Sequence, residues 1–177
     1  MPNYCECYLR ISNDTDESGI AEVENFIKDD SSLISFNKIV PYPDNWRKLD
    51  DDRQAWEQEI AKLSDGERQK IDWSKAPKDG YNQDGYNWCV LNWGTKWDAC
   101  NPSLYGGKKY DNEITLMFET AWAPPTPAID ALALKFPKYL FCLEYYERGM
   151  QFCGSIIWED GKRKNETQGE YFGFRGG

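Results

Sequence analysis

The alternation of residue types along Tyr4–Ile11 constrains the fold most strongly. Every second side chain is apolar, and a period of two predicts a β-strand with one buried face. The buried face is expected to contain Cys5, Cys7, Leu9 and Ile11. The next apolar residues follow helical spacing instead: Ile20, Val23, Phe26 and Ile27. A half-buried strand followed by an amphipathic helix is typical of an α+β domain.

The middle of the chain changes from a strand pattern to a charged, helical pattern. A second strand is expected over Leu33–Val40, stopped by Pro41 and Pro43. Residues 44–86 are charged and helical in pattern, and Ser64–Glu67 matches a capping box. The Trp-rich sequence follows these residues. Together they form a segment, at about 41–111, that differs in its residue pattern from the predicted strands before and after it.

After residue 111 the alternating patterns return. They predict, in order, a strand at Ile114–Phe118, a rigid connector at Thr120–Pro127, a helix over Ile129–Phe136, and a hairpin of Tyr139–Tyr146 with Met150–Trp158. A charged loop is expected after Asp160-Gly161, and then a short strand at Tyr171–Phe174.

This order matches a ferredoxin-like fold. We expect an α+β protein with an antiparallel sheet of the form β-α-β-insertion-β-α-β plus a hairpin strand, with both helices on one face. The chain is predicted to be one domain, 1–177, with a helical, Trp-rich inserted subregion at about 41–111. The other face of the sheet is either covered by the insertion or open.

The composition argues against an enzyme. The chain has no histidine, the side chain most used for proton transfer near neutral pH and the commonest metal ligand. No P-loop, dinucleotide or nucleophile-elbow motif occurs. Acidic runs such as Asp50–Asp52 are typical of solvated faces, although carboxylates holding a divalent ion are the remaining catalytic hypothesis. We therefore expect no catalytic residue, no metal site and no cofactor.

The cysteines and the expected location are linked. The sequence shows neither a signal-peptide pattern nor an apolar run of the ~20 residues that span a bilayer, so we expect a cytoplasmic protein with no membrane partner. In a reducing compartment the six cysteines are expected to be thiols. Cys142 and Cys153 lie in the two strands of the predicted hairpin, where they can face each other.

Charge suggests one candidate surface. The net charge is −9, and within residues 1–30 eight acids stand against Arg10 and Lys28. An acidic chain is unsuited to general binding of nucleic-acid backbone, but it suits a basic protein partner. The candidate acidic face consists of Glu17, Glu22, Glu24, Asp29 and Asp30. The alternative is a solvated helix face that contributes only solubility.

Tryptophans suggest a second candidate surface. Four of the eight fall in two short segments, 88–97 and 120–125. The candidate aromatic cluster consists of Trp88, Asn92, Trp93, Lys96, Trp97 and Trp122. Such rings stack nucleobases, with a lysine near a phosphate. Alternatively, they form a small core that fastens the insertion to the sheet.

Several spaced motifs resemble those of the YubB-like family. The motifs are Asn92-Trp-Gly-Thr-Lys-Trp-Asp98, Phe118-Glu-Thr-Ala-Trp-Ala-Pro-Pro125, Phe136-Pro137 and Tyr145-Tyr-Glu-Arg-Gly149 with Phe152-x-Gly154. The resemblance covers most of the chain and implies a ferredoxin-like domain in a small protein carried by a phage or plasmid, in a bacterial host. The family has no settled activity, and such proteins frequently blunt host defence, which is an argument by analogy.

Two functions from different classes follow from these observations. The first is a non-catalytic binding protein that inhibits a host factor stoichiometrically, such as an anti-phage defence component of CRISPR type or another type (an anti-CRISPR in the former case). The alternative is a nucleotide or single-stranded nucleic-acid binding module that uses the aromatic cluster.

Overall fold

The computed structural model describes residues 3–13, 19–110 and 112–177. The chain divides into two compact units. One unit comprises residues up to 41 together with those from 90 onward, and the other comprises residues 42–89. We call them the sheet unit and the helical unit, and each is described by itself.

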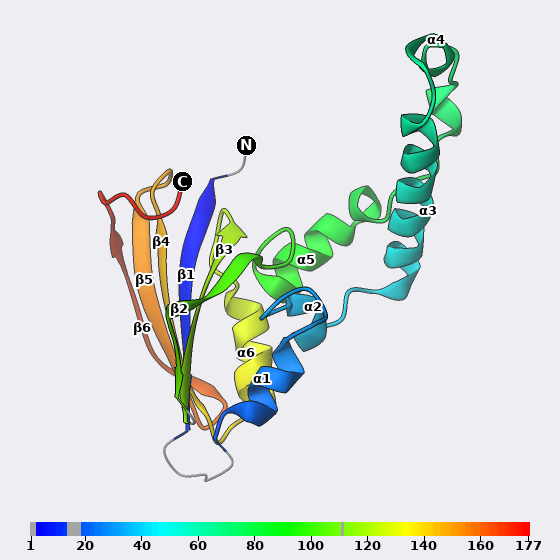
Figure 1. Ribbon diagram of the computed structural model, residues 1–177. Helices are drawn as coiled ribbons and strands as arrows, with labels where there is room; N and C mark the ends of the chain where they lie inside the picture. Colours follow the sequence, from blue (N-terminus) through cyan, green and yellow to red (C-terminus); the bar gives the residue numbers. More distant parts are fainter. Residues whose placement is uncertain (1–2, 14–18, 111) are drawn as a thin grey trace. The chain divides into compact units, whose positions relative to one another are not determined.

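The sheet unit contains one six-stranded sheet (Figure 1). Its strands are β1 (Tyr4–Ser12), β2 (Cys100–Tyr110), β3 (Glu113–Ala121), β4 (Leu140–Glu147), β5 (Phe152–Glu159) and β6 (Lys162–Glu170). They lie in the order β2-β3-β1-β4-β5-β6, and every neighbouring pair is antiparallel. β1 is central, with Leu9 opposite Leu116 on one side and opposite Leu143 on the other.

Three helices cover one face of this sheet, as Figure 1 shows: α1 (Ala21–Ile27), α2 (Phe36–Ile39) and α6 (Thr126–Lys135). The core lies between the helices and the sheet. The predicted inner face of β1 is confirmed, since its four apolar side chains are fully buried. Phe36, Phe118 and Phe141 are also fully buried, and each such side chain contributes about 1.5–3 kcal/mol to stability through burial.

The topology confirms the ferredoxin-like prediction. β1 and β2 run parallel with β3 between them, and β3 and β4 run parallel with β1 between them. These two interleaved crossovers give the order β4-β1-β3-β2. The hairpin strands β5 and β6 extend this sheet beyond β4.

The second strand was placed wrongly in the sequence analysis. Leu33–Val40 contains the short helix α2, and β2 is the second strand of the fold. The reason is Asp98, whose carboxylate accepts hydrogen bonds from Phe36 N at 2.5 Å and Ser35 Oγ at 2.7 Å. A carboxylate there satisfies the free N–H groups of a helix start. The inserted helices therefore precede the second strand instead of following it.

The prediction of a loop after Asp160-Gly161 was also wrong, because this charged segment forms strand β6. Asp160 and Gly161 have φ values of 53° and 72°, the left-handed pair of a tight hairpin turn. This turn folds β6 back onto β5, although every residue of β6 is exposed. No strand forms at Tyr171–Phe174.

Two smaller expectations also need correction. The connector Thr120–Pro127 is shorter than predicted, because α6 begins at Thr126 with Pro127 in its first turn, where a missing N–H costs little. Cys142 and Cys153 do not face each other, since they pair with Ile157 and Tyr146 respectively. All six cysteines are free thiols.

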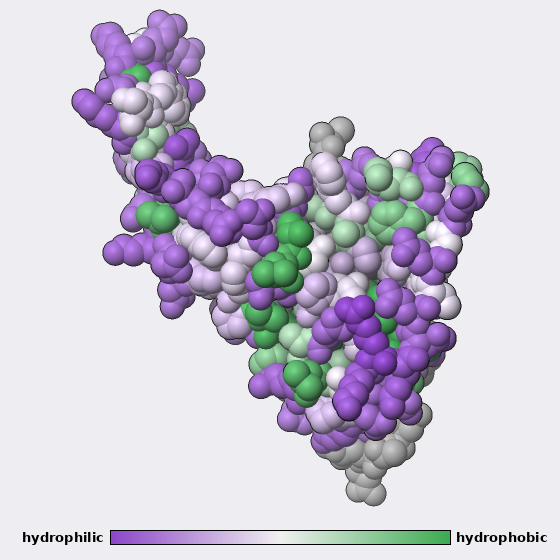
Figure 2. All heavy atoms as spheres, turned by 180° about the vertical axis from the view of Figure 1, so that it is seen from behind, coloured by the Kyte–Doolittle hydropathy of each residue, from purple (hydrophilic) through white to green (hydrophobic). Residues whose placement is uncertain are grey.

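The helical unit contains α3 (Asp44–Ala61), α4 (Asp65–Arg68), two 3-10 turns (Trp73–Lys75 and Tyr81–Gln83) and the start of α5 (Gly85–Trp93). The predicted capping box is present, with Ser64 N donating to Glu67 Oε2 at 2.9 Å. The Trp56 and Trp73 rings meet edge to face at 5.3 Å. α3 buries no residue completely, so this unit has little core. Figure 2 shows mostly hydrophilic residues on the surface of α3 and α4. None of the described helices combines the length and the apolar composition needed to cross a bilayer.

Candidate functional site

The open face of the sheet is the side away from α1, α2 and α6. Within the described part of the sheet unit, no helix covers it (Figure 1). Its side chains come from the positions that alternate with the core. On the two central strands β1 and β4 they are Tyr4, Glu6, Tyr8, Arg10, Cys142, Glu144 and Tyr146.

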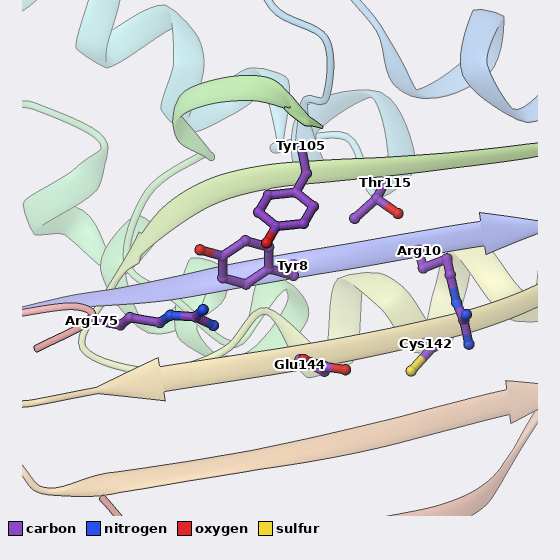
Figure 3. Close-up of a pocket in the computed structure, with 7 residues that line it drawn as sticks. All are labelled: Tyr8, Arg10, Tyr105, Thr115, Cys142, Glu144 and Arg175. Atoms are coloured by element: carbon purple, nitrogen blue, oxygen red, sulfur yellow. The ribbon is translucent and has the colours of Figure 1, made fainter. Parts of the chain in front are cut away.

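A pocket of about 240 Å³ lies in this open face (Figure 3). It is lined by Tyr8, Arg10, Tyr105, Thr115, Cys142, Glu144 and Arg175. Figure 3 shows the rings of Tyr8 and Tyr105 with Arg175 at one end, and Arg10 near Cys142 at the other. The Tyr8 and Tyr105 rings meet edge to face, with centroids 4.9 Å apart. Residues from four strands and from the segment after β6 therefore converge on one hollow.

Arg175 approaches this hollow from the segment Tyr171–Gly177, which we call the tail segment. Its guanidinium carbon lies 5.2 Å from the Tyr8 ring centroid and 4.9 Å from that of Tyr146. Both distances are within the range of cation–π attraction. Arg175 Nε also lies 4.0 Å from Glu6 Oε1. The guanidinium is thus held by two rings and one carboxylate.

The backbone of the tail segment fits closely against the ends of β1 and β4. Gly177 N donates to Tyr4 O at 2.8 Å, and Arg175 N donates to the Tyr171 hydroxyl at 2.9 Å. Gly176 has φ of 72°, and a Cβ there would come within 2.5 Å of Tyr146 O. Position 176 therefore requires glycine, because its φ is positive and because a side chain would collide with Tyr146 O.

Carboxylates hold the hydroxyl groups of both tyrosines. The Tyr8 hydroxyl donates to Glu6 Oε1, and the Tyr146 hydroxyl donates to Glu144 Oε2 at 3.3 Å. Burial and the bond to Glu6 raise the pKa of Tyr8 to about 12, and burial and the charge of Glu144 raise the pKa of Tyr146. Both rings are therefore neutral at pH 7, while two carboxylates lie beside them.

The thiol in the pocket has no sign of activation. Burial raises the pKa of Cys142, so the thiolate is scarce at neutral pH. Among the residues that the structure describes, no group of three or more Cys, Asp or Glu side chains is placed to hold a metal ion. The arrangement is suited to binding a cation by rings and carboxylates.

The candidate aromatic cluster is spread over several environments. Trp93 is buried, and its Nε1 donates to Val40 O at 2.8 Å. Trp88 is half-buried and packs against Tyr42 in the helical unit, with centroids 5.6 Å apart. Asn92 is half-buried on α5. These three residues are parts of the packing and are not gathered into one surface.

Lys96, Trp97 and Trp122 are brought together. The Lys96 amine lies 4.4 Å from the Trp97 ring centroid and 4.8 Å from that of Trp122. Trp97 is half-buried, whereas Trp122 is 59% exposed. The lysine is therefore already engaged by the two rings, and only Trp122 offers a broad surface to solvent.

The candidate acidic face is only partly assembled. Glu17 lies outside the described residues. Glu22 is 3.6 Å from Lys138 Nζ, and Asp29 accepts hydrogen bonds from Ser31, whose backbone N–H lowers the pKa of Asp29. Glu24 is half-buried on α1, and Asp30 is exposed beyond its end.

The motifs that carried the family resemblance have structural roles. Thr95 Oγ1 exchanges two hydrogen bonds of 3.0 Å with the backbone of Ala121, which fastens the Trp-rich motif to the end of β3. A Cβ at Gly154 would collide with the Tyr145 ring across the β4–β5 pair. The buried Glu147 carboxylate accepts hydrogen bonds from the backbone of Gly149 and Met150 in the turn. These motifs therefore specify architecture.

Sequence reasoning missed the residues of the open-face site. Tyr8 and Arg10 alternate with the predicted buried residues of Tyr4–Ile11, which puts them on the opposite face of the strand, but nothing in the sequence links them to Tyr146, Tyr105 or Arg175. The single Arg-Gly-Gly at 175–177 was the available signal, and only the fold brings it back over β1 and β4.

The class of protein is thus a ferredoxin-like α+β fold with an extended sheet. Residues 91–173 match the family described as the ferredoxin-like domain in Api92-like protein, a span that includes five of the six strands. Among solved structures, the crystal structure of a protein api92 from Yersinia pseudotuberculosis is similar, with a TM-score of 0.50 and 12% identity over 97% of this chain and 98% of that chain. At this identity the similarity shows the fold. No curated protein sequence matches the chain.

Proposed function

We propose that this protein is a non-catalytic binding protein that contacts a protein partner through the open face of its sheet. The observation that carries the proposal is the Tyr8–Tyr146–Arg175 group at the centre of a sheet face that no described helix covers. Tyrosine and arginine are among the residue types that dominate binding energy at protein interfaces.

Charge supports a basic partner. The chain has a net charge of −9, and Glu6 and Glu144 lie on the open face beside the tyrosines. The open face also carries Arg10 and Arg175, so it is the net charge of the chain that favours a basic partner. A chain of this charge attracts a basic protein over a distance and repels nucleic-acid backbone.

The biological role that we propose is stoichiometric inhibition of a host factor by a protein from a phage or plasmid. The support is the motif resemblance to the YubB-like family, together with an acidic surface suited to basic, nucleic-acid-handling defence proteins, CRISPR-type or other. Expression of the chain in defended bacterial strains tests this role. Increased phage plating on at least one strain is expected, and unchanged plating on all of them would contradict it.

Site-specific crosslinking tests the binding surface. A benzoylphenylalanine placed at Tyr105, which is 54% exposed at the pocket, is expected to crosslink a partner. The matched control is the same probe at Leu134, which is 72% exposed on α6. The captured protein, once purified, should bind the wild type, and its affinity should fall at least tenfold for a Tyr8→Ala, Tyr146→Ala double variant. Equal capture from both positions would contradict the proposal.

A second candidate function is nucleotide or single-stranded nucleic-acid binding at Trp122. The observation in its favour is an exposed indole with the Lys96 amine 4.8 Å from its centroid. Stacking on such a ring contributes about 1–3 kcal/mol per base. Titration with oligothymidylate is expected to quench the fluorescence of the wild type and not that of Trp122→Phe. Absence of quenching in the wild type removes this candidate.

A further inference from the structure

We infer that the open face contains a binding site specific for an arginine side chain, and that Arg175 fills it from within the same chain. The site consists of Tyr8, Tyr146, Glu6 and Glu144, which we call the arginine cage. The inference deepens the proposed function, because it names what the open face recognises on the partner: an arginine followed by glycine in an extended segment.

Both rings of the arginine cage lie within cation–π distance of the same guanidinium. The Tyr8 and Tyr146 rings are nearly perpendicular, at 83°, with centroids 6.2 Å apart. The Arg175 guanidinium carbon is about equally distant from both, at 5.2 and 4.9 Å. A guanidinium stacks on aromatic faces and is weakly hydrated, whereas a lysine ammonium is compact and strongly hydrated. Because the guanidinium loses less hydration when it is brought against two rings, the cage favours arginine over lysine.

The charges around the cage favour a cation. Glu6 and Glu144 hold the two tyrosine hydroxyls, and Glu6 lies 4.0 Å from the guanidinium. The Glu6 side chain is only 20% exposed, so its attraction is less screened than at an open surface. Arg10 is the other cation lining the pocket, at its opposite end (Figure 3).

The backbone contacts define the residue that follows the arginine. Gly176 approaches Tyr146 O and Tyr4 O too closely for a side chain, and Gly177 N donates to Tyr4 O. A ligand that binds in the same way therefore needs glycine, which has no side chain, after its arginine. It also needs a backbone N–H one residue further on. The cage therefore accepts Arg-Gly followed by a residue with a backbone N–H, as in Arg175-Gly-Gly177.

The tail segment is held in a way that permits exchange. The Arg175 side chain remains 47% exposed, and the rings of Phe172 and Phe174 are 74% and 88% exposed. No large apolar side chain of the tail segment is buried. A partner's arginine can therefore replace Arg175. It competes with Arg175 at a high effective concentration, because Arg175 and the cage belong to the same chain.

Peptide binding to the full chain tests the inference. The probe is the blocked peptide acetyl-Gly-Phe-Arg-Gly-Gly-amide, followed through the backbone amide shifts of Tyr8 and Tyr146 by NMR. Arg175→Ala is expected to bind it about tenfold more tightly than the wild type does, the factor that two partly exposed cation–π contacts give. A peptide with lysine in place of arginine should bind at least fivefold more weakly to this variant.

Two further variants separate the cage from a general acidic attraction. Glu6→Gln in the Arg175→Ala background should weaken peptide binding severalfold, because it removes the nearest carboxylate. Arg68→Ala, which removes a partly exposed arginine of the helical unit, should leave binding as in the wild type. Wild-type-like unfolding curves show that each variant is folded.

The inference is overturned if Arg175→Ala binds the peptide no more tightly than the wild type, or if the lysine peptide binds equally well. The same applies if neither protein shows shifts at millimolar peptide. These results leave the crosslinking test intact, so a partner captured at Tyr105 would preserve the proposed function without the arginine cage. Failure of both tests removes both.

Discussion

Asp98 shows how a single side chain decides local structure far away in the sequence. Its carboxylate accepts hydrogen bonds from Ser35, Phe36, Asn37 and Ala99. Leu33–Val40 reads as a strand by itself, but this carboxylate supplies the acceptors that the start of α2 lacks. The strand pattern of this short segment is thus outweighed by hydrogen bonds to one acid about 60 residues later, and the segment contains a helix.

Replacing Asp98 is therefore predicted to be costly. Asp98→Ala should lower the free energy of unfolding by about 2 kcal/mol, because several backbone and hydroxyl donors lose a charged acceptor. Asp98→Asn, which keeps one acceptor oxygen, should lower it by about half as much. Urea denaturation measures both values. Asp30→Ala, at an exposed acid, is the control and should stay within about 0.5 kcal/mol of the wild type.

Tyr8 gives a prediction about pH. Its pKa rises from 10.0 to about 12 in the folded protein, so its contribution to stability is complete below pH 10 and is lost as the pH rises from 10 toward 12. Absorbance titration of the folded protein should show that Tyr8→Phe removes amplitude near pH 12. Amplitude lost near pH 10 instead would contradict both the burial of Tyr8 and its bond to Glu6 in the folded protein.

At the scale of elements, one ion pair joins β6 to α6. All its residues are exposed, and Arg163 donates to both oxygens of Asp130 on α6, at 2.7 and 2.5 Å. Asp130 also accepts from Trp158 Nε1 at 2.7 Å. Partial burial alone would raise the pKa of Asp130, but the hydrogen bonds from Arg163 and Trp158 outweigh it and lower the pKa.

Arg163→Ala is predicted to loosen β6. The expected loss is about 1 kcal/mol at pH 7, with faster hydrogen exchange of the amides in 162–170. Because the folded pKa of Asp130 is lowered, the pair stabilises the fold above the ordinary value of 3.8 and ceases to do so as the pH falls through the folded pKa. The difference between variant and wild type should therefore shrink in acid. Lys164→Ala, at an exposed pair with Asp160, should leave the exchange unchanged.

The tail segment depends on a glycine. Gly176→Ala should detach it, because the new Cβ would meet Tyr146 O and Tyr4 O and because φ is 72°. The Gly177 amide, which donates to Tyr4 O, is expected to exchange with solvent much faster in NMR measurements. Gly169→Ala has open space around its Cβ and is the matched control. Unchanged protection of Gly177 would contradict the packing described here.

At the scale of the whole molecule, the two units differ in core size. Nearly all fully buried apolar side chains belong to the sheet unit, whereas α3 buries none completely. Burial of apolar surface is the main source of stability, so the helical unit should open at a lower free energy. Native-state hydrogen exchange is expected to be faster for α3 amides than for β1 amides as denaturant is added. Equal rates in both would show that the two units unfold together.

The sequence by itself determined the fold class and most of the elements of the sheet unit. β1, α1, β3, α6, β4 and β5 were predicted because their apolar residues recur with a period of two or 3.6, which records which face is buried. Each of these patterns lies within one element, so it can be recognised without knowing which other elements pack against it. The helical character of 44–86 was legible for the same reason, together with its capping box.

Only the tertiary structure decided the elements whose partners are distant. α2 exists because Asp98 reaches it, and β6 exists because a tight turn and β5 offer it backbone partners, although no residue of β6 is buried. The candidate site follows the same rule. Tyr8, Tyr146 and Arg175 are more than 160 residues apart at the extremes, and they meet because β4 pairs with β1 and the tail segment returns across both. Periodicity encodes burial, whereas contacts between remote side chains are set by the pairing of strands.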